Sequence, residues 1–302
     1  MSGPGQTVQR ELPVIVCAVD DSDRAAHTVR AAGWLASELD ARVVVAHVFD
    51  PLGVQVPPSK ELSLGSLTET ELVNAVREHA ERSLGSVAEL LGDIDHTIVF
   101  AEGNPVAELL RTVREHDARL LVTGPEPADK LDLVLIGSVT GELASRSPCP
   151  VVAVSPDAAL AEPGPVLAAY DGSDHSLRAA RHGAALAARM GRDLVLLHVT
   201  ERDDDPVRAN KQLGRELFEA AGRALEGEVQ RRALDLRVSI ANETGRAVEG
   251  IARVARDRRA ALIVGGTRGL SPAAAALVGS VSAGVVRTAG RPVVLATPSA
   301  GR

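Results

Sequence analysis

Short apolar runs alternate along this 302-residue chain with longer stretches of helical periodicity, and the alternation occurs twice. In the first half, apolar runs cover residues 14–19 and 43–48, and an alanine-rich helical stretch covers 24–39 between them. In the second half, the run at 166–170 is followed by a helical stretch at 175–190. Strands that alternate with helices form βαβ crossovers and hence a parallel sheet. We predict an α/β fold of two tandem open sheets, each five-stranded, parallel and flanked by helices.

The same polar residues recur at the ends of corresponding strands. Each half opens with a strand that ends in Asp-x-Ser, at Asp20 and at Asp171. Each second strand ends in His-Val, at Val48 and at Val199, and each half closes with a Gly-Ser pair, a short helix and a proline-led strand. Ligands of open α/β sheets bind beyond the carboxyl ends of the strands, so chemistry is expected at these residues.

Residues 155–165 separate the two repeats and are rich in proline, alanine and acidic residues, as exposed linkers are. We therefore assign one domain to residues 1–157 and a second to residues 158–302. The last apolar run of each half, 151–154 and 293–296, would be an exposed sheet edge in an isolated domain, and proteins avoid such edges. We expect the halves to pack on each other as a pseudo-dimer within the chain.

The second half contains a glycine-rich segment after its fourth predicted strand. Gly266, Gly269 and the pair Gly279-Ser280 have the spacing G-x2-G-x9-G-S. Gly266 and Gly269 permit positive φ and a close approach of the backbone to a ligand. The hydroxyls of Ser280 and Ser282, with the free N–H groups of a helix start, would attract an anion. The segment is neither a Walker A loop nor a dinucleotide fingerprint. Its plain alternative is a strand-to-helix turn that uses glycine for geometry and serine for capping.

With these features the chain resembles a tandem universal stress protein, over about residues 12–155 and 164–297. The resemblance implies a Rossmann-like sheet in the order 3-2-1-4-5, dimerisation through the last strand and ATP at the glycine-rich loop. It implies that Asp171 meets the ribose or adenine, beside Ala169 and Tyr170, and that Val199 contacts adenine. The residues implied for the ribose and phosphates are Gly265, Gly266, Arg268, Gly269, Gly279, Ser280, Val281 and Ser282.

The first half departs from this pattern at its corresponding loop. Pro127 stands where the second glycine is expected, and proline fixes φ and removes a hydrogen-bond donor. Glu126, Asp129 and Asp132 add negative charge near the expected phosphates. We therefore predict a degenerate first site that is weak or empty. Its residues would be Asp20, Val48, Gly124, Gly137, Ser138, Val139 and Thr140.

Charge and composition narrow the class of partner. A formal net charge of -7 and an aromatic content of 2% argue against nucleic acid, which needs a basic face and stacking side chains. Cys17 and Cys149 lie in or beside apolar runs, and we interpret them as buried thiols rather than as a disulfide framework. The first residues lack the pattern of a signal peptide, and no apolar run has the length of a membrane helix. We expect a cytoplasmic protein.

Other polar residues were weighed for catalysis and metal binding. His47 and His198 occupy equivalent strand ends among apolar neighbours, and we interpret both as structural. No Cys/His cluster has zinc spacing, and no residue is assigned as a metal ligand. No catalytic residue is assigned either, because no base is evident that would activate water, so any ATP hydrolysis should be slow.

The sequence thus predicts a nucleotide-dependent sensor or regulator of a stress response, with ATP, ADP or AMP as its ligand, Mg²⁺ beside a triphosphate, and pairing of two chains as a further option. Two alternatives stay open. The acidic pair Asp20-Asp21 is typical of a phospho-receiver, although the third strands end near Phe100 and Ala241 without a phosphoacceptor aspartate. An ATP-pyrophosphatase-type enzyme has a similar fold, but neither half opens with a Ser-Gly-Gly-x-Asp-Ser loop.

Overall fold

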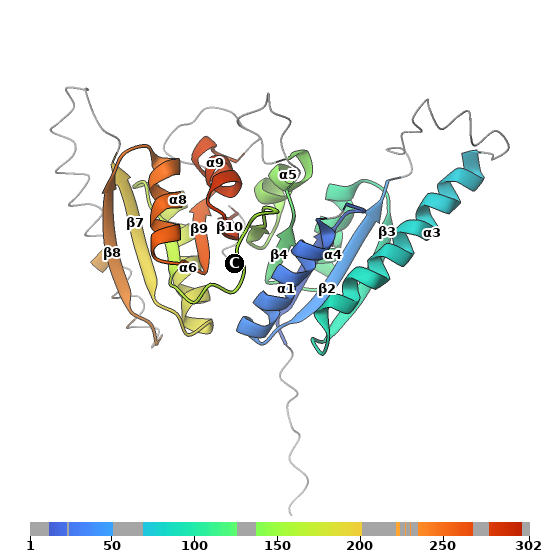
Figure 1. Cartoon of the computed structure of the whole chain (residues 1–302), viewed down its shortest axis with the longest axis horizontal. Helices are drawn as coiled ribbons and strands as arrows, with labels where there is room; N and C mark the ends of the chain where they lie inside the picture. Colours follow the sequence, from blue (N-terminus) through green and yellow to red (C-terminus); the bar gives the residue numbers. More distant parts are fainter. Residues whose placement is uncertain are drawn as a thin grey trace, which may run out of the picture.

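The apolar runs of both halves become strands of one ten-stranded sheet (Figure 1). The computed structural model describes residues 12–22, 24–50, 69–125, 137–200, 235–267 and 278–297, with residues 222, 223, 227 and 230. The strands are β1 (Val14–Val19), β2 (Arg42–Phe49), β3 (His96–Glu102), β4 (Leu120–Thr123), β5 (Val151–Ala153), β6 (Val166–Ala169), β7 (Leu194–Thr200), β8 (Val238–Thr244), β9 (Leu262–Gly266) and β10 (Val293–Ala296). The helices are α1 (Ala25–Leu39), α3 (Glu69–Ala88), α4 (Pro105–Glu115), α5 (Ser138–Arg146), α6 (Asp174–Arg189), α8 (Ala247–Asp257) and α9 (Ser280–Thr288), and a 3-10 turn covers Glu89–Leu91.

Strand order along the sheet is β3-β2-β1-β4-β5-β10-β9-β6-β7-β8. Within each half this is the order 3-2-1-4-5, and the strands of each half pair in parallel. The predicted α/β class and strand order are confirmed. The expectation of two separate sheets is corrected, because β5 and β10 pair antiparallel and join the two halves into one continuous sheet.

The seam between the halves is made of apolar backbone that would otherwise form two sheet edges. Val152 lies opposite Val294, and Val151 lies opposite Leu295. All four of these side chains are fully buried. The pairing confirms that the last strand of each half covers that of the other, which removes two aggregation-prone edges at once. The domain boundary between residues 157 and 158 stays a prediction.

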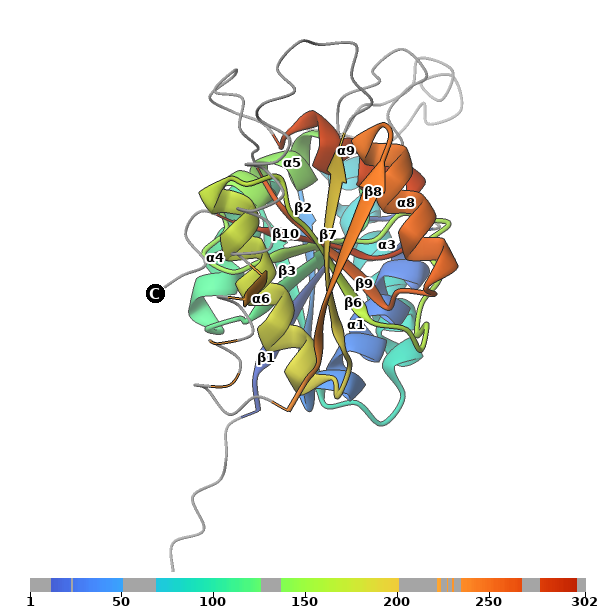
Figure 2. The same ribbon diagram turned by 90° about the vertical axis from the view of Figure 1, so that its left-hand side faces the viewer.

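Helices cover both faces of the twisted sheet (Figure 2). Alternate residues of a strand point to opposite faces, so Ile15 and Cys17 pack with α1, α3 and α6, whereas Val14 and Val16 pack with α4, α5, α8 and α9. Each apolar layer runs across the seam and includes residues of both halves. The cores consist mainly of Val, Leu, Ile and Ala, as expected for a parallel sheet that is covered on both faces.

The linker after β5 is held against the second half and also contacts the first. The Gly164 N–H donates to the carbonyl oxygen of Arg259 at 3.0 Å. Arg192 donates to the carbonyl oxygen of Glu162 at 2.8 Å, and the same guanidinium lies 2.6 Å from the carboxylate of Glu38 on α1. A single arginine therefore connects the linker, the second half and a helix of the first half.

Two further expectations concern the strand ends and the thiols. The third strands run further than the sequence pattern indicated: β3 ends at Glu102 and β8 at Thr244, rather than near Phe100 and Ala241. Cys17 and Cys149 are buried free thiols, as interpreted from the sequence.

Of the helices in the described part of the chain, none combines the length and the apolar character that a membrane crossing requires.

Candidate functional site

Three adjacent strands of the second half, in the order β9-β6-β7, bring predicted site residues to one edge of the sheet. Ala169 ends β6, Gly266 ends β9, and Val199 is the penultimate residue of β7. Parallel pairing of β6 with both neighbours places these carboxyl ends side by side. The strand order reverses here, which is where open α/β sheets bind their ligands.

The loop after β6 is shaped by its own polar side chains. One carboxylate oxygen of Asp171 accepts from the N–H of Ser173 at 3.0 Å, and Ser173 caps α6 by accepting from the N–H of Ser176 at 3.1 Å. Gly172 between them has φ 91°, a backbone conformation that glycine adopts without strain. Asp171 is exposed, and no described residue forms an ion pair with it. Its carboxylate therefore has acceptor capacity for a ligand hydroxyl.

Helix α9 begins directly beside the end of β9. The N–H of Gly279, the residue before the helix, donates to the carbonyl oxygen of Thr267 at 2.8 Å. The hydroxyl of Ser282 donates to the carbonyl oxygen of Gly266 at 2.6 Å, so the first turn is fixed to the strand end. Ser280, at the first position of the helix, is exposed. The first-turn N–H groups, which have no partner within the helix, carry partial positive charge suited to an anion.

The glycines of this segment act differently from the sequence expectation. Gly266 ends β9 in a strand conformation and does not use the positive φ that glycine permits. A side chain on Gly265 would come 3.4 Å from the hydroxyl of Ser282, which shows how closely strand and helix approach. Arg268 and Gly269 lie outside the described residues, as do Pro127, Glu126, Asp129 and Asp132. Their predicted roles stay predictions.

Val199 is positioned by helix α8. A Cβ added to Gly250 of that helix would come 2.9 Å from a methyl group of Val199, so the glycine allows the helix to lie close over β7. Val199 and Ala169 are both half-buried and pack at the margin of the same apolar layer. The two residues give the strand ends an apolar surface next to the polar Asp171 loop.

The two strand-end histidines bind the backbone of the neighbouring strand. The Nδ1 atom of His47 lies 3.0 Å from the carbonyl oxygen of Val19, and that of His198 lies 2.9 Å from the carbonyl oxygen of Tyr170. His47 also stacks on Phe100 with ring centroids 5.5 Å apart. Each ring fixes the second strand to the end of the first, in agreement with the structural interpretation.

Tyr170 follows β6 at the centre of these strand ends. Burial raises the pKa of its hydroxyl, and the negative charges of Asp171 and Asp174 raise it further. The hydroxyl therefore stays protonated at neutral pH and is able to donate a hydrogen bond. Within the described ranges, no group of three or more His, Cys, Asp or Glu side chains is arranged to hold a metal ion.

The first half has a cavity of about 220 Å³ at the equivalent strand ends. It is lined by all seven residues that were predicted for the first-half site, namely Asp20, Val48, Gly124, Gly137, Ser138, Val139 and Thr140. The structure thus brings the whole predicted set together. The volume lies below the range of about 300–1,000 Å³ that is usual for small-molecule pockets.

Other residues that the sequence analysis did not assign to the site also line this cavity, among them Arg24, Thr28, Pro105 and Leu109. Arg24 is the important one, because its guanidinium lies 3.3 Å from the carboxylate of Asp20 and also donates to the hydroxyl of Ser22. The available signal was the spacing, since opposite charges one helical turn apart tend to pair. The second half has His175 at this position.

The helix that follows the loop starts differently in the two halves. Gly137, before α5, has φ 86°, whereas Gly279, before α9, has φ -58°. Only glycine adopts the first conformation easily, so a side chain at position 137 is strained and one at position 279 is not. Inside α5, Thr140 contacts Thr123 of β4 through hydroxyl groups 3.2 Å apart.

Comparison with known proteins places this geometry in a family. The model of the universal stress protein family matches the chain twice, over residues 12–155 and 164–297. The chain belongs to the universal stress protein family. A universal stress protein of Mycolicibacterium smegmatis is 32% identical to it over 294 residues, which cover 94% of this chain and 97% of the relative.

Solved universal stress proteins share the fold. One from Archaeoglobus fulgidus superimposes with a TM-score of 0.63 at 20% identity, covering 94% of this chain and 98% of its own. Another, determined in complex with cAMP, is 27% identical and covers 44% of this chain and 95% of its own, with a TM-score of 0.35. The two separate matches of the family model agree with the repeat in the sequence.

Proposed function

We propose that this universal stress protein binds ATP, ADP or AMP at the strand ends of its second half and acts in the cytoplasm as a nucleotide-dependent regulator. The observation that carries the proposal is the position of two complementary groups on neighbouring strands. The exposed carboxylate of Asp171 follows β6, and the start of α9 lies beside the end of β9. A ribose hydroxyl is a donor for the carboxylate, and phosphate oxygens are acceptors for the helix N–H groups.

The remaining surface fits a flat apolar base. Ala169 and Val199 are half-buried at the same strand ends, and Tyr170 lies beside them. Mg²⁺ would accompany a triphosphate. Because the described residues hold no cluster of metal-binding side chains, phosphate oxygens and water would be its main ligands. We assign Asp171 to the ribose and assign no residue as a base that activates water, so we expect hydrolysis to be slow.

The first half is proposed to bind nucleotide more weakly than the second. Its Asp20 is already paired with Arg24, whereas no described residue forms an ion pair with Asp171. Its cavity is also small for a nucleotide. The two halves would then differ in affinity although they share one fold.

Calorimetric titration of the purified protein with ATP, ADP and AMP, each with and without Mg²⁺, tests the proposal. We expect micromolar binding of at least one nucleotide, with one dominant site per chain. The variant Asp171→Asn should weaken this binding, and Asp20→Asn should leave the dominant site unchanged. Absence of nucleotide binding, together with phosphorylation of an aspartate by acetyl phosphate, would instead establish a phospho-receiver.

A further inference from the structure

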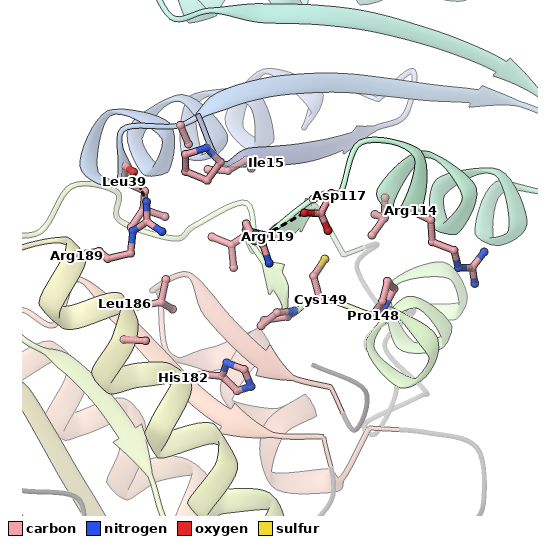
Figure 3. Close-up of a pocket in the computed structure, with 17 residues that line it drawn as sticks. Ile15, Leu39, Arg114, Asp117, Arg119, Pro148, Cys149, His182, Leu186 and Arg189 are labelled. Carbon is pink, nitrogen blue, oxygen red and sulfur yellow. Dashed lines mark hydrogen bonds and ion pairs between the residues drawn. The ribbon is translucent and has the colours of Figure 1, made fainter. Parts of the chain in front are cut away.

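A second cavity, of about 680 Å³, lies at the opposite edge of the first-half sheet and borders the second half (Figure 3). Pro13, Arg119 and Pro150, which precede β1, β4 and β5, form part of its wall. The carboxyl-terminal part of α6 forms the facing wall. The cavity therefore exists only because the two halves share a sheet, and its volume is within the usual range of about 300–1,000 Å³ for small-molecule sites.

In the second half, the linker fills the place that corresponds to this cavity. Glu162 of the linker accepts from the guanidinium of Arg259 at 2.8 Å and lies 3.9 Å from that of Arg291. Arg259 corresponds to Asp117 at the cavity. Each has positive φ and lies two residues after the helix that follows the third strand of its half. On that edge, a stretch of chain with a carboxylate occupies the place where the first half is hollow.

A pair of equivalent helix residues differs strongly in size between the two sides. Trp34 of α1 and Ala185 of α6 each lie six residues before the left-handed residue that follows their helix, Asp40 and Gly191. Trp34 packs against the buried core on the linker side of the molecule. Ala185 is exposed and lines the cavity. The indole that takes up space on one side has only a methyl group as its counterpart on the other.

The charges around the cavity also differ from those of the filled edge. Glu38, which pairs with Arg192 at 2.6 Å, has Arg189 as its counterpart on α6. Arg189 lines the cavity and donates to the carbonyl oxygen of Leu39. Arg119 also lines it and pairs with Asp117 at 3.1 Å. Arg114 also lines the cavity, so three arginine side chains and one carboxylate, that of Asp117, surround it in a protein whose net charge is -7.

We propose that this cavity is a second ligand site, which takes a monocarboxylate with an apolar body. The apolar part of the ligand lies against Ile15, Leu120 and Leu186, all of which line the cavity. Its carboxylate takes the place that Glu162 has on the filled edge and is bound by Arg119 and Arg189. Guanidinium groups bind carboxylates through parallel N–H···O bonds, which distinguishes such a ligand from a neutral or cationic one.

Decanoate is a suitable probe, with decan-1-ol and decyltrimethylammonium as neutral and cationic controls of the same chain length. The titrations use the full chain with saturating ATP, so that binding at the nucleotide cleft does not contribute. We expect decanoate to bind about tenfold more tightly than decan-1-ol, the difference that charge-assisted hydrogen bonds to an exposed pair of arginines supply. Equal binding of all three probes, or no binding of decanoate, would overturn the proposal.

Two variants locate the binding. Ala185→Trp places on α6 the residue that the other half has, and it should lower decanoate affinity more than tenfold through loss of volume. The control Ala107→Trp, on the exposed face of α4, should not change it. The double variant Arg119→Gln/Arg189→Gln removes only exposed side chains, so it should fold normally and lose the preference for decanoate over decan-1-ol. Arg256→Gln is its matched control on α8.

A variant that ends at Thr297 separates a ligand from the chain's own last residues. The hydroxyl of Thr297 lies 3.5 Å from the carbonyl oxygen of Cys149, which lines the cavity. Unchanged decanoate affinity in this variant supports a small-molecule site. Binding that appears only after residues 298–302 are removed would show that the cavity belongs to that segment, and the proposal would fail.

Discussion

The carboxylate of Asp20 lies 3.3 Å from the guanidinium of Arg24, and the equivalent Asp171 has no ion pair with any described residue. Both aspartates follow the first strand of their half, and both accept from the backbone N–H two residues later. The two aspartates therefore accept the same backbone hydrogen bond but differ in their ion pairing. We expect this single difference to contribute to unequal nucleotide affinity.

Replacing Arg24 by histidine, the residue type at position 175, should strengthen nucleotide binding by the first half. The gain should reach at most about fivefold, because a partly exposed ion pair is worth about 0–1 kcal/mol. The measurement is an ATP titration in a chain whose second site is disabled by Gly279→Glu. In the reciprocal control, His175→Arg in the otherwise natural chain should weaken the second site by a similar factor. No change in either chain would mean that the Asp20 pairing does not limit binding.

Ser280 and Ser282 should respond differently to substitution, although both begin α9. Ser280 is exposed, so Ser280→Ala should reduce ATP affinity by about 1 kcal/mol, or about fivefold, without changing the melting temperature. Ser282 holds the helix to β9 through the carbonyl oxygen of Gly266, so Ser282→Ala should also lower stability by about 1 kcal/mol. Melting curves and ATP titrations on both variants decide the matter. Equal stability losses would contradict the separation of roles.

Arg192 should contribute more to stability than an arginine in an exposed ion pair. Its side chain is only 14% exposed, that of Glu38 is 22% exposed, and it also donates to linker carbonyl oxygens. Arg192→Ala leaves these partly buried acceptors without this donor and should cost about 1–3 kcal/mol. The control Arg253→Ala breaks the more exposed pair with Glu243 and should cost about 0–1 kcal/mol. Urea unfolding of both variants measures the difference, and similar losses would refute the interfacial role.

The sequence predicted the fold well because the relevant signals are local and repeated. The apolar runs ending at Asp20 and Asp171 recur with the same helical stretch after them, and such a repeat specifies both halves at once. That the two halves form one continuous sheet was harder to predict from the sequence. Pairing of Val152 with Val294 joins residues far apart in sequence, and only the apolar character of the last strands indicated that they must be covered.

The sequence predicted which residues belong to the candidate site but not their contacts or backbone conformations. Motif spacing identified Gly137, Ser138 and Thr140, and the structure lines one cavity with them. Arg24 was missed because its contribution depends on the direction of its side chain just before α1, which spacing alone does not give. Gly266 does not use the positive φ that glycine permits, because the strand continues through this residue, whereas Gly137 of the other half has φ 86°.

Stability should fall at alkaline pH through the buried thiols. Burial raises the pKa of Cys149 to about 11 from an ordinary value of 9.0. A folded-state pKa above the unfolded value means that the thiol's contribution is complete below pH 9 and is lost as the pH rises toward 11. In that window the loss is about 1.4 kcal/mol per pH unit for this one group. Urea unfolding between pH 7 and pH 11 should therefore show a shallower decline in Cys149→Ala than in the natural chain. Identical slopes would show that the thiol ionises as easily in the folded protein as in the unfolded one.

Gly279→Glu is the most direct test of the nucleotide cleft. Gly279 precedes α9 with φ -58°, a conformation open to any residue, so the substitution should not strain the backbone. The added carboxylate would lie where the phosphates are proposed to bind, and like charges a few ångströms apart in a partly desolvated site repel by several kcal/mol. We expect at least about a hundredfold loss of ATP affinity with little change in melting temperature.

Gly137→Glu is the matched control, because φ 86° at that position makes any side chain costly by about 1–3 kcal/mol. It should lower the melting temperature and leave the dominant ATP site intact. If well-folded Gly279→Glu protein retained its ATP affinity, the start of α9 would not be the phosphate site, and its glycine and serines would serve only the strand-to-helix turn.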